Sequence, residues 1–310
     1  HPVAHSFPTR RSSDLAAKIC RNFFYTHFAL TLIKQQEGLL NSSDLILLTG
    51  KPHLTRIKKH VPRILMHSVR GATRASNFKH LKKADGVVFW GGCERDHPAY
   101  LVKQLPHISL FPAVEHDLFH PGVPDPDIKR MLGGDDPGTP LAVFVGRLDN
   151  VNRVDRIIET VKELVLDGKP LKLLIVGDGS RLRELEQQAS RLPAGVVTFL
   201  GHRSRSDVAE ILRAADIFVM FPEWNNHPIS LMEAIASGVY AIAPETGRIP
   251  EIMGSEPFGD IVPVNDRAAF RSAIATALDK KPYLKRGEQG AVASHISTWK
   301  SNAENILKFY

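Results

Sequence analysis

Cysteine and long apolar runs are scarce in this sequence. Its 310 residues include only two cysteines, Cys20 and Cys93, which is too few for a disulfide framework or a thiolate metal site. No apolar run approaches the roughly 20 residues that a membrane-spanning helix needs. With 43% hydrophobic and 24% charged residues, the composition is that of an ordinary globular protein of about two domains. The lack of disulfide-forming cysteine favours a reducing, cytoplasmic setting.

An excess of acidic residues is also missing, and the charge balance changes along the chain. The net charge is +7, yet residues 138–310 hold equal numbers of acidic and basic side chains, so the positive excess lies in residues 1–137. A basic half fits a peripheral contact with anionic lipid at the inner face of a membrane, or an anionic substrate, and fits a merely soluble surface equally well. Nucleic acid is a poorer partner, because the basic residues at 51–63 are not interleaved with aromatic side chains that could stack on bases.

The first fifteen residues do not have the character of a folded segment. The string HSFPTRRSSDL at residues 5–15 resembles one reading frame of a common sequencing adapter translated into protein. We therefore treat residues 1–15 as an artefactual leader and leave them out of the fold. The sequence then predicts that the natural N-terminus has been lost and that the first domain is incomplete.

Short apolar runs separated by helix-like segments predict two parallel sheets with helical crossovers. The first part of the chain has four such runs, at residues 44–50, 63–69, 85–92 and 107–112. The second part has six, at residues 141–146, 171–177, 196–201, 217–221, 240–244 and 260–264. A segment rich in Pro, Gly and Asp between residues 121 and 140 predicts the linker. We expect an N-terminal domain with its linker at 16–137, a Rossmann-type domain at 138–293 and a final helix at 294–310 that returns to the first domain.

Residues 216–247 have the most informative local pattern. An apolar run, a polar loop, a helix-like PISLMEAIASG and a second apolar run predict one strand–loop–helix–strand unit. Pro228 suits the first helical position, where its missing N–H costs no hydrogen bond. The N–H groups of residues 229–231 would then form an anion site, and Glu233, one turn further, could reach a sugar hydroxyl beside a bound phosphate. The alternative is an ordinary crossover helix with a solvated glutamate.

Turns after several predicted strands combine glycine with polar residues. The sequence GR follows the run at 141–146, GDG ends the run at 171–177, and GH ends the run at 196–201. Because the carboxyl ends of parallel strands share one edge, these turns are expected to line one crevice. The GDG triplet alone is a weak signal, and the convergence of several turns is a stronger one. His67 lies near the end of a run in the first half, where ligand contacts occur, although a lone histidine is as often a structural hydrogen-bonder.

Several motifs resemble the family 4 glycosyltransferases, retaining enzymes with two Rossmann-like domains that face each other across a cleft (the GT-B fold). The stretches FVGRL, LLIVGDGSRLRELE, VTFLG, LRAADIFVMFP, PISLMEAIASG and TGRIPEIM are similar to that family's donor-domain blocks and stand in the same order. The resemblance is strong over residues 141–264 and fair over residues 44–121. It implies an α/β fold of two facing Rossmann-like domains, of which the first is incomplete here.

The resemblance also implies roles for the residues that match the family's donor-site pattern. That pattern has an arginine after the first donor-domain strand, a lysine five residues on, and two glutamates. Arg147 matches the arginine, and Glu233 matches the second glutamate, which holds the ribose in the family. Asn152 stands at the lysine position and Asn225 at the first-glutamate position, so both depart from the pattern. His67 matches a histidine that lies near the donor sugar in the family.

From this match we predict a catalytic group and a donor-binding group. The catalytic group is His67, Arg147 and Asn225. The donor-binding group is Arg153, Gly177, Asp178, Gly179, His227, Ile229, Ser230, Leu231 and Glu233. Arg153 is included because it could replace the cation missing at Asn152, as Arg156 could, while Glu223 could supply the carboxylate missing at Asn225. No metal site is legible, since His116 and His120 fit a loop better than a pair of zinc ligands.

The predicted function is transfer of a sugar from a nucleotide diphosphate sugar to an acceptor hydroxyl, with retention and without a further cofactor. The acceptor would be a glycan, a lipid-linked compound or a small molecule. A second hypothesis, favoured by the two asparagines, is a catalytically weak or inactive nucleotide-sugar-binding relative. A dinucleotide oxidoreductase ranks last, because no GxGxxG turn follows any predicted strand. With its first domain incomplete, this chain is expected to bind nucleotide but to transfer little sugar.

Overall fold

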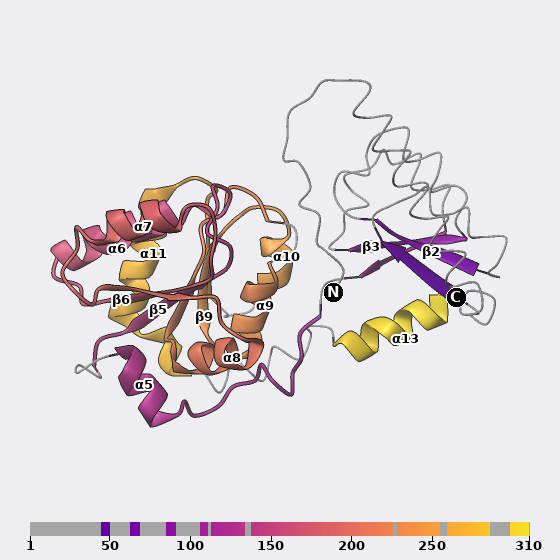
Figure 1. Ribbon diagram of the computed structural model, residues 1–310, viewed down its shortest axis with the longest axis horizontal. Helices are drawn as coiled ribbons and strands as arrows, with labels where there is room; N and C mark the ends of the chain where they lie inside the picture. Colours follow the sequence, from indigo (N-terminus) through magenta and orange to yellow (C-terminus); the bar gives the residue numbers. More distant parts are fainter. Residues whose placement is uncertain are drawn as a thin grey trace, which may run out of the picture. The chain divides into compact units, whose positions relative to one another are not determined.

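The computed structural model divides into two compact units, His1–Ser109 and Leu110–Tyr310 (Figure 1). The residues that it describes are 45–49, 63–68, 85–90, 106–110, 113–133, 138–225, 228–254, 259–285 and 298–309. For residues 45–49, 63–68, 90, 129, 133 and 299 the description covers the backbone alone. The predicted leader at residues 1–15 lies outside the described residues.

Among the described residues, the first unit is a sheet of four strands that lie side by side in chain order. They are β1 (Leu45–Thr49), β2 (Arg63–Ser68), β3 (Gly86–Trp90) and β4 (His107–Leu110). The first three pair in parallel, and the β3 side chains of Val87, Val88 and Phe89 are buried. The four predicted strands of this half are therefore confirmed, because short continuous apolar runs suit strands of a buried parallel sheet.

The second unit contains a six-stranded parallel sheet in the order β10-β9-β8-β5-β6-β7 within the described part of the chain. Its strands are β5 (Leu141–Val145), β6 (Lys172–Val176), β7 (Val197–Gly201), β8 (Ile217–Val219), β9 (Tyr240–Pro244) and β10 (Gly259–Val262). All six predicted runs form strands. The order reverses between β5 and β8, and such a reversal opens a ligand crevice at the carboxyl ends of the two strands.

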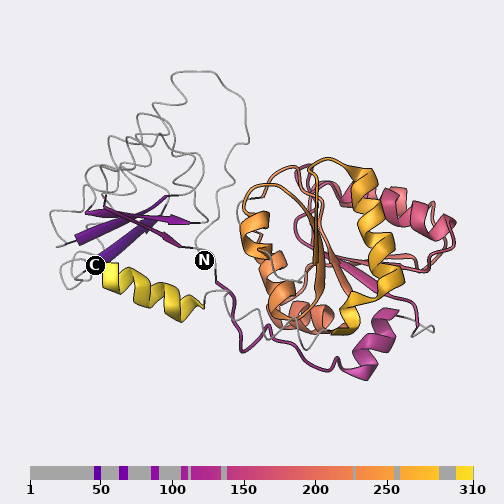
Figure 2. The same cartoon turned by 180° about the vertical axis from the view of Figure 1, so that it is seen from behind.

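Helices cover both faces of this second sheet (Figures 1 and 2). One face is covered by α6 (Val154–Leu166), α7 (Leu182–Ala189) and α11 (Arg267–Lys280), and the other by α8 (Arg205–Ala214), α9 (Ile229–Ala236) and α10 (Ile249–Met253). A short 3-10 turn, η3 (Pro282–Lys285), follows α11. Right-handed crossovers between parallel strands require this arrangement. None of the helices that the structure describes is long and apolar enough to cross a membrane.

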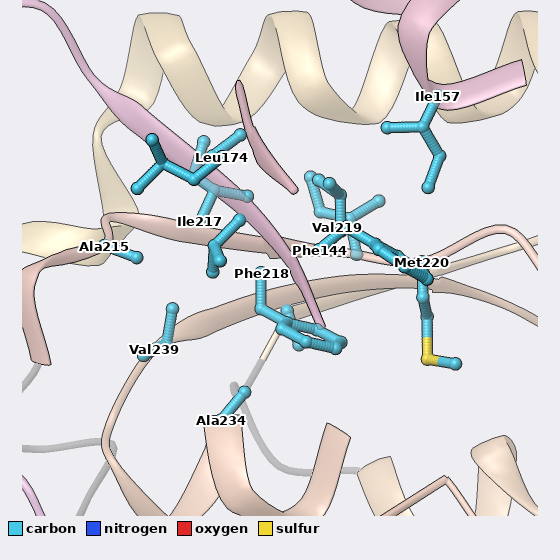
Figure 3. Close-up of a cluster of buried hydrophobic side chains, with 14 of the residues drawn as sticks. Phe144, Ile157, Leu174, Ala215, Ile217, Phe218, Val219, Met220, Ala234 and Val239 are labelled. Atoms are coloured by element: carbon cyan, nitrogen blue, oxygen red, sulfur yellow. The ribbon is translucent and has the colours of Figure 1, made fainter. Parts of the chain in front are cut away.

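The core of the second unit lies between the sheet and its helices (Figure 3). Phe144 of β5 and Phe218 of β8 are at most 1% exposed. Ile157 of α6 packs over one face of the sheet, and Ala234 of α9 packs over the other. Each fully buried aliphatic or aromatic side chain stabilises the fold by about 1.5–3 kcal/mol. A rigid core of this kind holds the loops at the strand ends in fixed positions.

The segment before β5 packs on the second unit. Val114, Phe119 and Leu132 belong to that unit's core, and α5 (Pro126–Gly133) contacts α8. The sequence assigned residues 110–137 to the first domain and its linker, because their Pro and Gly content dominates the pattern. Their few apolar side chains nevertheless bury themselves in the nearest core. The domain bounds at 137 and 138 stay a prediction, as does the docking of the final helix, α13 (Trp299–Phe309), which is confirmed as a helix.

Candidate functional site

The loops at the carboxyl ends of β5, β6 and β7 are bonded to one another. The Gly177 N–H donates to the Gly201 carbonyl oxygen at 2.9 Å, and the Gly146 N–H donates to the Val176 carbonyl oxygen at 3.0 Å. A Cβ atom on Gly177, whose φ is +137°, would lie 1.9 Å from the Gly146 carbonyl oxygen, and one on Gly179 would lie 2.3 Å from a backbone oxygen. Both glycines are therefore required for the loops to approach each other. Their predicted contact with a donor stays a prediction.

Asp178, between these glycines, joins the same set of loops. Its side-chain Oδ1 accepts the Gly179 N–H at 2.6 Å, and its backbone oxygen accepts the Leu148 N–H at 2.9 Å. The turn after β6 is thus fastened to the loop after β5. The predicted crevice-lining turns do converge on one edge of the sheet, as the shared direction of parallel strands requires.

The loop between β5 and α6 contains the predicted arginine and its first departure from the family pattern. The Arg147 side chain is 83% exposed, and its Nη2 lies 3.3 Å from Asp149 Oδ2. The Asn152 side chain turns back into the loop, where Nδ2 donates to the Arg147 carbonyl oxygen at 2.7 Å. Asp149 also accepts the Asn152 N–H at 3.1 Å. Asn152 therefore braces the loop that presents Arg147.

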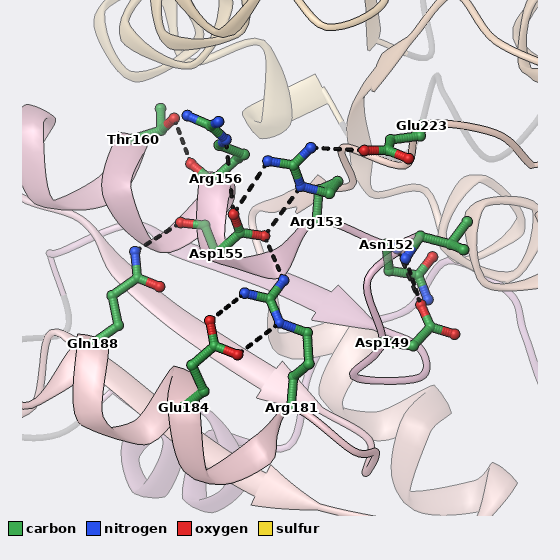
Figure 4. Close-up of polar contacts among 11 residues, drawn as sticks. Asp149, Asn152, Arg153, Asp155, Arg156, Thr160, Arg181, Glu184, Gln188 and Glu223 are labelled. Atoms are coloured by element: carbon green, nitrogen blue, oxygen red, sulfur yellow. Dashed lines mark hydrogen bonds and ion pairs between the residues drawn. The ribbon is translucent and has the colours of Figure 1, made fainter.

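Arg153 and Glu223, the two predicted replacements for missing charges, are bonded to each other (Figure 4). Arg153 Nη1 donates to Glu223 Oε1 at 2.7 Å, while its Nε and Nη2 each lie 3.3 Å from the Asp155 carboxylate. Arg153 stands just before α6 with φ 48° and ψ 41°, a left-handed conformation that is uncommon outside glycine. The guanidinium is thus held by a carboxylate on each side.

Asp155 extends these contacts into a charge network, made of Glu223, Arg153, Asp155, Arg181 and Glu184 (Figure 4). Arg181 Nη1 donates to Asp155 Oδ1 at 2.9 Å, and Arg181 Nε donates to Glu184 Oε2 at 3.0 Å. Burial alone would raise the pKa of Asp155, but hydrogen bonds from Arg153 and Arg181 outweigh burial and leave that pKa below its usual value. Hydrogen bonds to Asp155 and Glu223 raise the pKa of Arg153.

The loop after β8 is fixed against its two neighbours. The Glu223 N–H donates to the Val151 carbonyl oxygen at 2.9 Å, and the Thr246 hydroxyl donates to the Glu223 carbonyl oxygen at 3.1 Å. Gly247, with φ +57°, lies so close that a Cβ atom there would be 1.9 Å from the Asn225 carbonyl oxygen. The backbone of Asn225 is therefore placed at the carboxyl edge. His227, also predicted to bind the donor, lies outside the described residues.

Helix α9 begins one residue later than predicted. Pro228 is the residue before the helix, with φ −76° and ψ 68°, rather than the first helical residue, and no side chain caps this end. The Met232 N–H makes the first helical hydrogen bond, to the Pro228 carbonyl oxygen at 3.1 Å. The N–H groups of Ile229, Ser230 and Leu231 therefore have no acceptor within the helix. The helix start is thus shifted by one residue relative to Pro228, and the binding of an anion by these N–H groups stays a prediction.

Glu233, in the second turn of α9, is 8% exposed. The alternative of a solvated glutamate is thus wrong, because α9 packs this face against the rest of the unit. Burial raises the pKa of Glu233 to about 7; the charge of Arg205 opposes that rise, and the charge of Glu115 adds to it. The pKa of this carboxyl therefore lies much closer to neutral pH than that of an unperturbed glutamate.

Arg205, the first residue of α8, is a neighbour of Glu233 that the sequence did not single out. Its Nη2 lies 3.3 Å from Glu233 Oε1 and 3.8 Å from Glu115 Oε1. The guanidinium carbon lies 5.3 Å from the ring centroid of Phe119, within the range of a cation–π interaction. No sequence signal links these residues, because they come from three separate segments. We call Glu233, Arg205 and Glu115 the Glu233 cluster.

His67 lies in β2 of the first unit. Its backbone pairs in register with Thr49 of β1 and Val88 of β3, so it is near the carboxyl end of its strand, as expected. Its place beside a donor sugar stays a prediction. His116 is in a turn and His120 follows it. In the described ranges, no group of three or more His, Cys, Asp or Glu side chains could hold a metal ion.

A comparison with protein families finds one matching model. Residues 128–292, just over half of the chain, match the model of the glycosyl transferases group 1 family. The match covers β5 to η3, and thus every loop of the edge described above. It also includes most of α5, which contacts α8.

Curated relatives include several named glycosyltransferases. A D-inositol 3-phosphate glycosyltransferase of Mycobacteroides abscessus is 29% identical over 209 residues, covering 65% of this chain and 45% of the relative. A lipopolysaccharide core biosynthesis mannosyltransferase of Rhizobium meliloti is 24% identical over 269 residues, covering 79% and 74%. A GDP-mannose-dependent alpha-mannosyltransferase of Mycobacterium tuberculosis is 31% identical over 153 residues, covering 49% and 37%. The chain spans less than half the length of several of these relatives.

Solved structures share the fold. A glycosyltransferase from Rickettsia africae aligns with a TM-score of 0.75 at 15% identity, covering 98% of this chain and 84% of the other. Sucrose-phosphate synthase from Thermosynechococcus elongatus aligns with a TM-score of 0.71 at 19% identity, covering 91% and 76%. HepE from Anabaena, solved in complex with UDP and glucose, aligns with a TM-score of 0.69 at 15% identity, covering 90% and 80%.

The fold, the order of the motifs and the family match agree with one another. The resemblance of the motifs predicted family 4 glycosyltransferases and the GT-B fold, and the comparisons confirm both. The chain therefore belongs to the glycosyl transferases group 1 family, the family 4 glycosyltransferases with the GT-B fold.

Proposed function

We propose that this chain is a retaining glycosyltransferase component that takes a sugar from a nucleotide diphosphate sugar and transfers it to an acceptor hydroxyl. Family membership supports the reaction class. Relatives and structural neighbours point to two donor classes, since HepE was solved with UDP-glucose and the Mycobacterium tuberculosis relative is named for GDP-mannose. The donor would bind at the carboxyl edge of the second sheet.

The observation that carries this proposal is the end of α9, where N–H groups without a helical acceptor stand one turn from the buried Glu233. A helix N-terminus favours an anion through its N–H groups and its dipole. A desolvated carboxylate nearby is suited to accept hydrogen bonds from ribose hydroxyls. Together these features fit a nucleoside diphosphate better than a neutral ligand.

The diphosphate would also be stabilised by arginine side chains of the loop after β5. Arg147 is exposed at this edge, and Arg153 follows in the same loop. Charge that develops on the departing diphosphate is lowered in energy by donors that are already in place, and this term often dominates transfer catalysis. Asn225 lacks a charge but can donate or accept hydrogen bonds to sugar hydroxyls. The role of His67 rests on its match to the family's histidine alone.

The acceptor is proposed in coarser terms as a glycan, a lipid-linked compound or a small molecule with a free hydroxyl. The positive excess in residues 1–137 supports an acceptor or membrane surface that is anionic. A second candidate function, binding of a nucleotide sugar without transfer, is supported by Asn152 and Asn225 in place of charged residues.

Calorimetry with UDP, GDP, UDP-glucose and GDP-mannose tests the donor site. Glu233→Ala should weaken nucleotide binding by about 1–3 kcal/mol, because the ribose hydroxyls lose a desolvated hydrogen-bond acceptor. Glu186→Ala, an exposed glutamate of α7, is the matched control and should bind as the wild type does. If none of the four ligands binds, the proposal fails. Binding without release of free nucleotide when acceptors are added would favour the second candidate function.

A further inference from the structure

The charged groups that act on Glu233 come from two other segments of the second unit. Arg205 of α8 approaches to 3.3 Å, and Glu115 acts through its charge from the segment before α5. The Glu115 carboxylate lies 3.8 Å from the same Arg205 nitrogen. One guanidinium group therefore faces two carboxylates, of which only Glu233 is buried.

Arg205 is held in this position by its surroundings. It is the first residue of α8, and Ser204 and Asp207 cap that helix reciprocally through side chain and backbone. Its guanidinium lies over the ring of Phe119, a side chain that is 0% exposed. The capped helix end and the buried ring favour a guanidinium position beside Glu233, while the Arg205 side chain stays 50% exposed.

We infer that Arg205 is a positioning residue of the donor site, which holds Glu233 in the ionised form and orientation that accept ribose hydroxyls. This inference rests on the proposed function. A buried carboxyl with no cation beside it stays protonated to a higher pH, and a protonated carboxyl offers fewer acceptor positions to the two hydroxyls. Arg205 would therefore act on the nucleotide only through Glu233. Glu115 competes for the same guanidinium and limits this effect.

The arrangement predicts a donor affinity that depends on pH near neutrality. The pKa of Glu233 is raised to about 7 by burial, against the charge of Arg205. Since the ionised form binds ribose, affinity should be full above that pKa and fall about tenfold for each pH unit below it. Without Arg205 the pKa would be higher still, so the loss would begin at higher pH.

The first experiment measures the Glu233 pKa itself in the unliganded protein, by carbon NMR of the labelled carboxyl group. Arg205→Met should move this pKa upward, Arg205→Lys should keep most of the wild-type value, and Arg203→Met should leave it unchanged. Arg203 is the matched control, because it is exposed and lies two residues away on the same segment. An unchanged Glu233 pKa in Arg205→Met would overturn the inference, whatever the protein binds.

The second experiment measures calorimetric affinity between pH 6 and pH 9 for UDP-glucose or GDP-mannose, whichever the wild type binds. A nucleotide sugar is chosen because free UDP or GDP carries a terminal phosphate that titrates near pH 6. The affinity of Arg205→Met for the nucleotide sugar should be at least fivefold lower than that of the wild type at pH 7. It should recover toward the wild-type affinity at pH 9. The 2′,3′-dideoxyribose analogue should show no such pH dependence. A loss of equal size at every pH would mean that Arg205 is merely structural, and would overturn the inference.

The two proposals fail in different ways. If the wild type binds neither nucleotide sugar, the proposed function fails, and the NMR result still decides whether Arg205 controls the ionisation of Glu233. If the wild type binds and Glu233→Gln weakens binding, but the pH profile of Arg205→Met superimposes on that of the wild type, the donor site stands and the positioning role is refuted.

Discussion

The charge network and the Glu233 cluster lie in the same unit, yet they affect ionisation in opposite ways. In the network, Asp155 receives hydrogen bonds from Arg153 and Arg181, and its pKa is lowered although it is partly buried. In the cluster, Glu233 faces one guanidinium that is shared with Glu115, and its pKa is raised to about 7. The direction of each pKa shift depends on how many hydrogen-bond donors the carboxylate has and on how deeply it is buried. The network is thereby suited to fix loops, and the cluster to respond to a ligand.

The largest expected effect concerns the stability of the protein at Glu233. Because its folded pKa of about 7 exceeds the unfolded value near 4.3, the stabilising contribution of this group is full below about pH 4 and is lost as pH rises through 7. The free energy of unfolding of Glu233→Gln should therefore rise by about 2–3 kcal/mol relative to that of the wild type as the pH goes from 4.5 to 8. Urea unfolding of both proteins across this range measures the difference, and a constant difference would contradict it.

The opposite pH behaviour is expected at Asp155. Its folded pKa is lowered, so its stabilising contribution is present above the unfolded pKa and lost only as pH falls through the folded one. Asp155→Asn should cost about 1–2 kcal/mol in the free energy of unfolding, because both arginines lose a charged acceptor. This cost should stay constant between pH 5 and pH 8, where the Glu233→Gln difference changes. If the stability differences of Asp155→Asn and Glu233→Gln depended on pH in the same way, the two sites would not differ in ionisation as expected.

The smallest effect separates the network's structural role from a role in donor binding. The diphosphate and the Glu223 carboxylate would compete for Arg153. Arg153→Ala should therefore weaken the binding of UDP or GDP by only about 1 kcal/mol. The corresponding nucleoside should lose nothing. Glu223→Gln is the matched variant and should bind the diphosphate slightly more tightly, because the competing charge is gone. Equal losses for nucleoside and diphosphate in Arg153→Ala would show that Arg153 only fixes the loop.

Much of the fold and part of the candidate site were predictable from the sequence. The ten strands that the structure describes all coincide with short apolar runs, because a strand in a buried parallel sheet needs apolar residues on both faces. The end of α9 and the place of Glu233 in it follow from local spacing, since helix geometry fixes which residues lie near the first turn. The start of α9 was predicted one residue too early, because proline is acceptable on either side of a helix start.

Sequence alone determined the strands and most helices of the second unit, because hydrophobic periodicity and glycine turns are local properties, and the resemblance of its motifs indicated the family. Helix α5 was not predicted, because it lies within the segment taken as a linker. Only the tertiary structure showed that Arg153 forms an ion pair with Glu223 and that Arg205 forms one with Glu233. These partners come from different crossovers, and nothing in their own neighbourhoods marks them as pairs. The burial of Val114, Phe119 and Leu132 in the second unit was decided in the same way. The ionisation of Glu233 depends on desolvation and on charges brought together by folding, so it belongs to the structure and not to the motif.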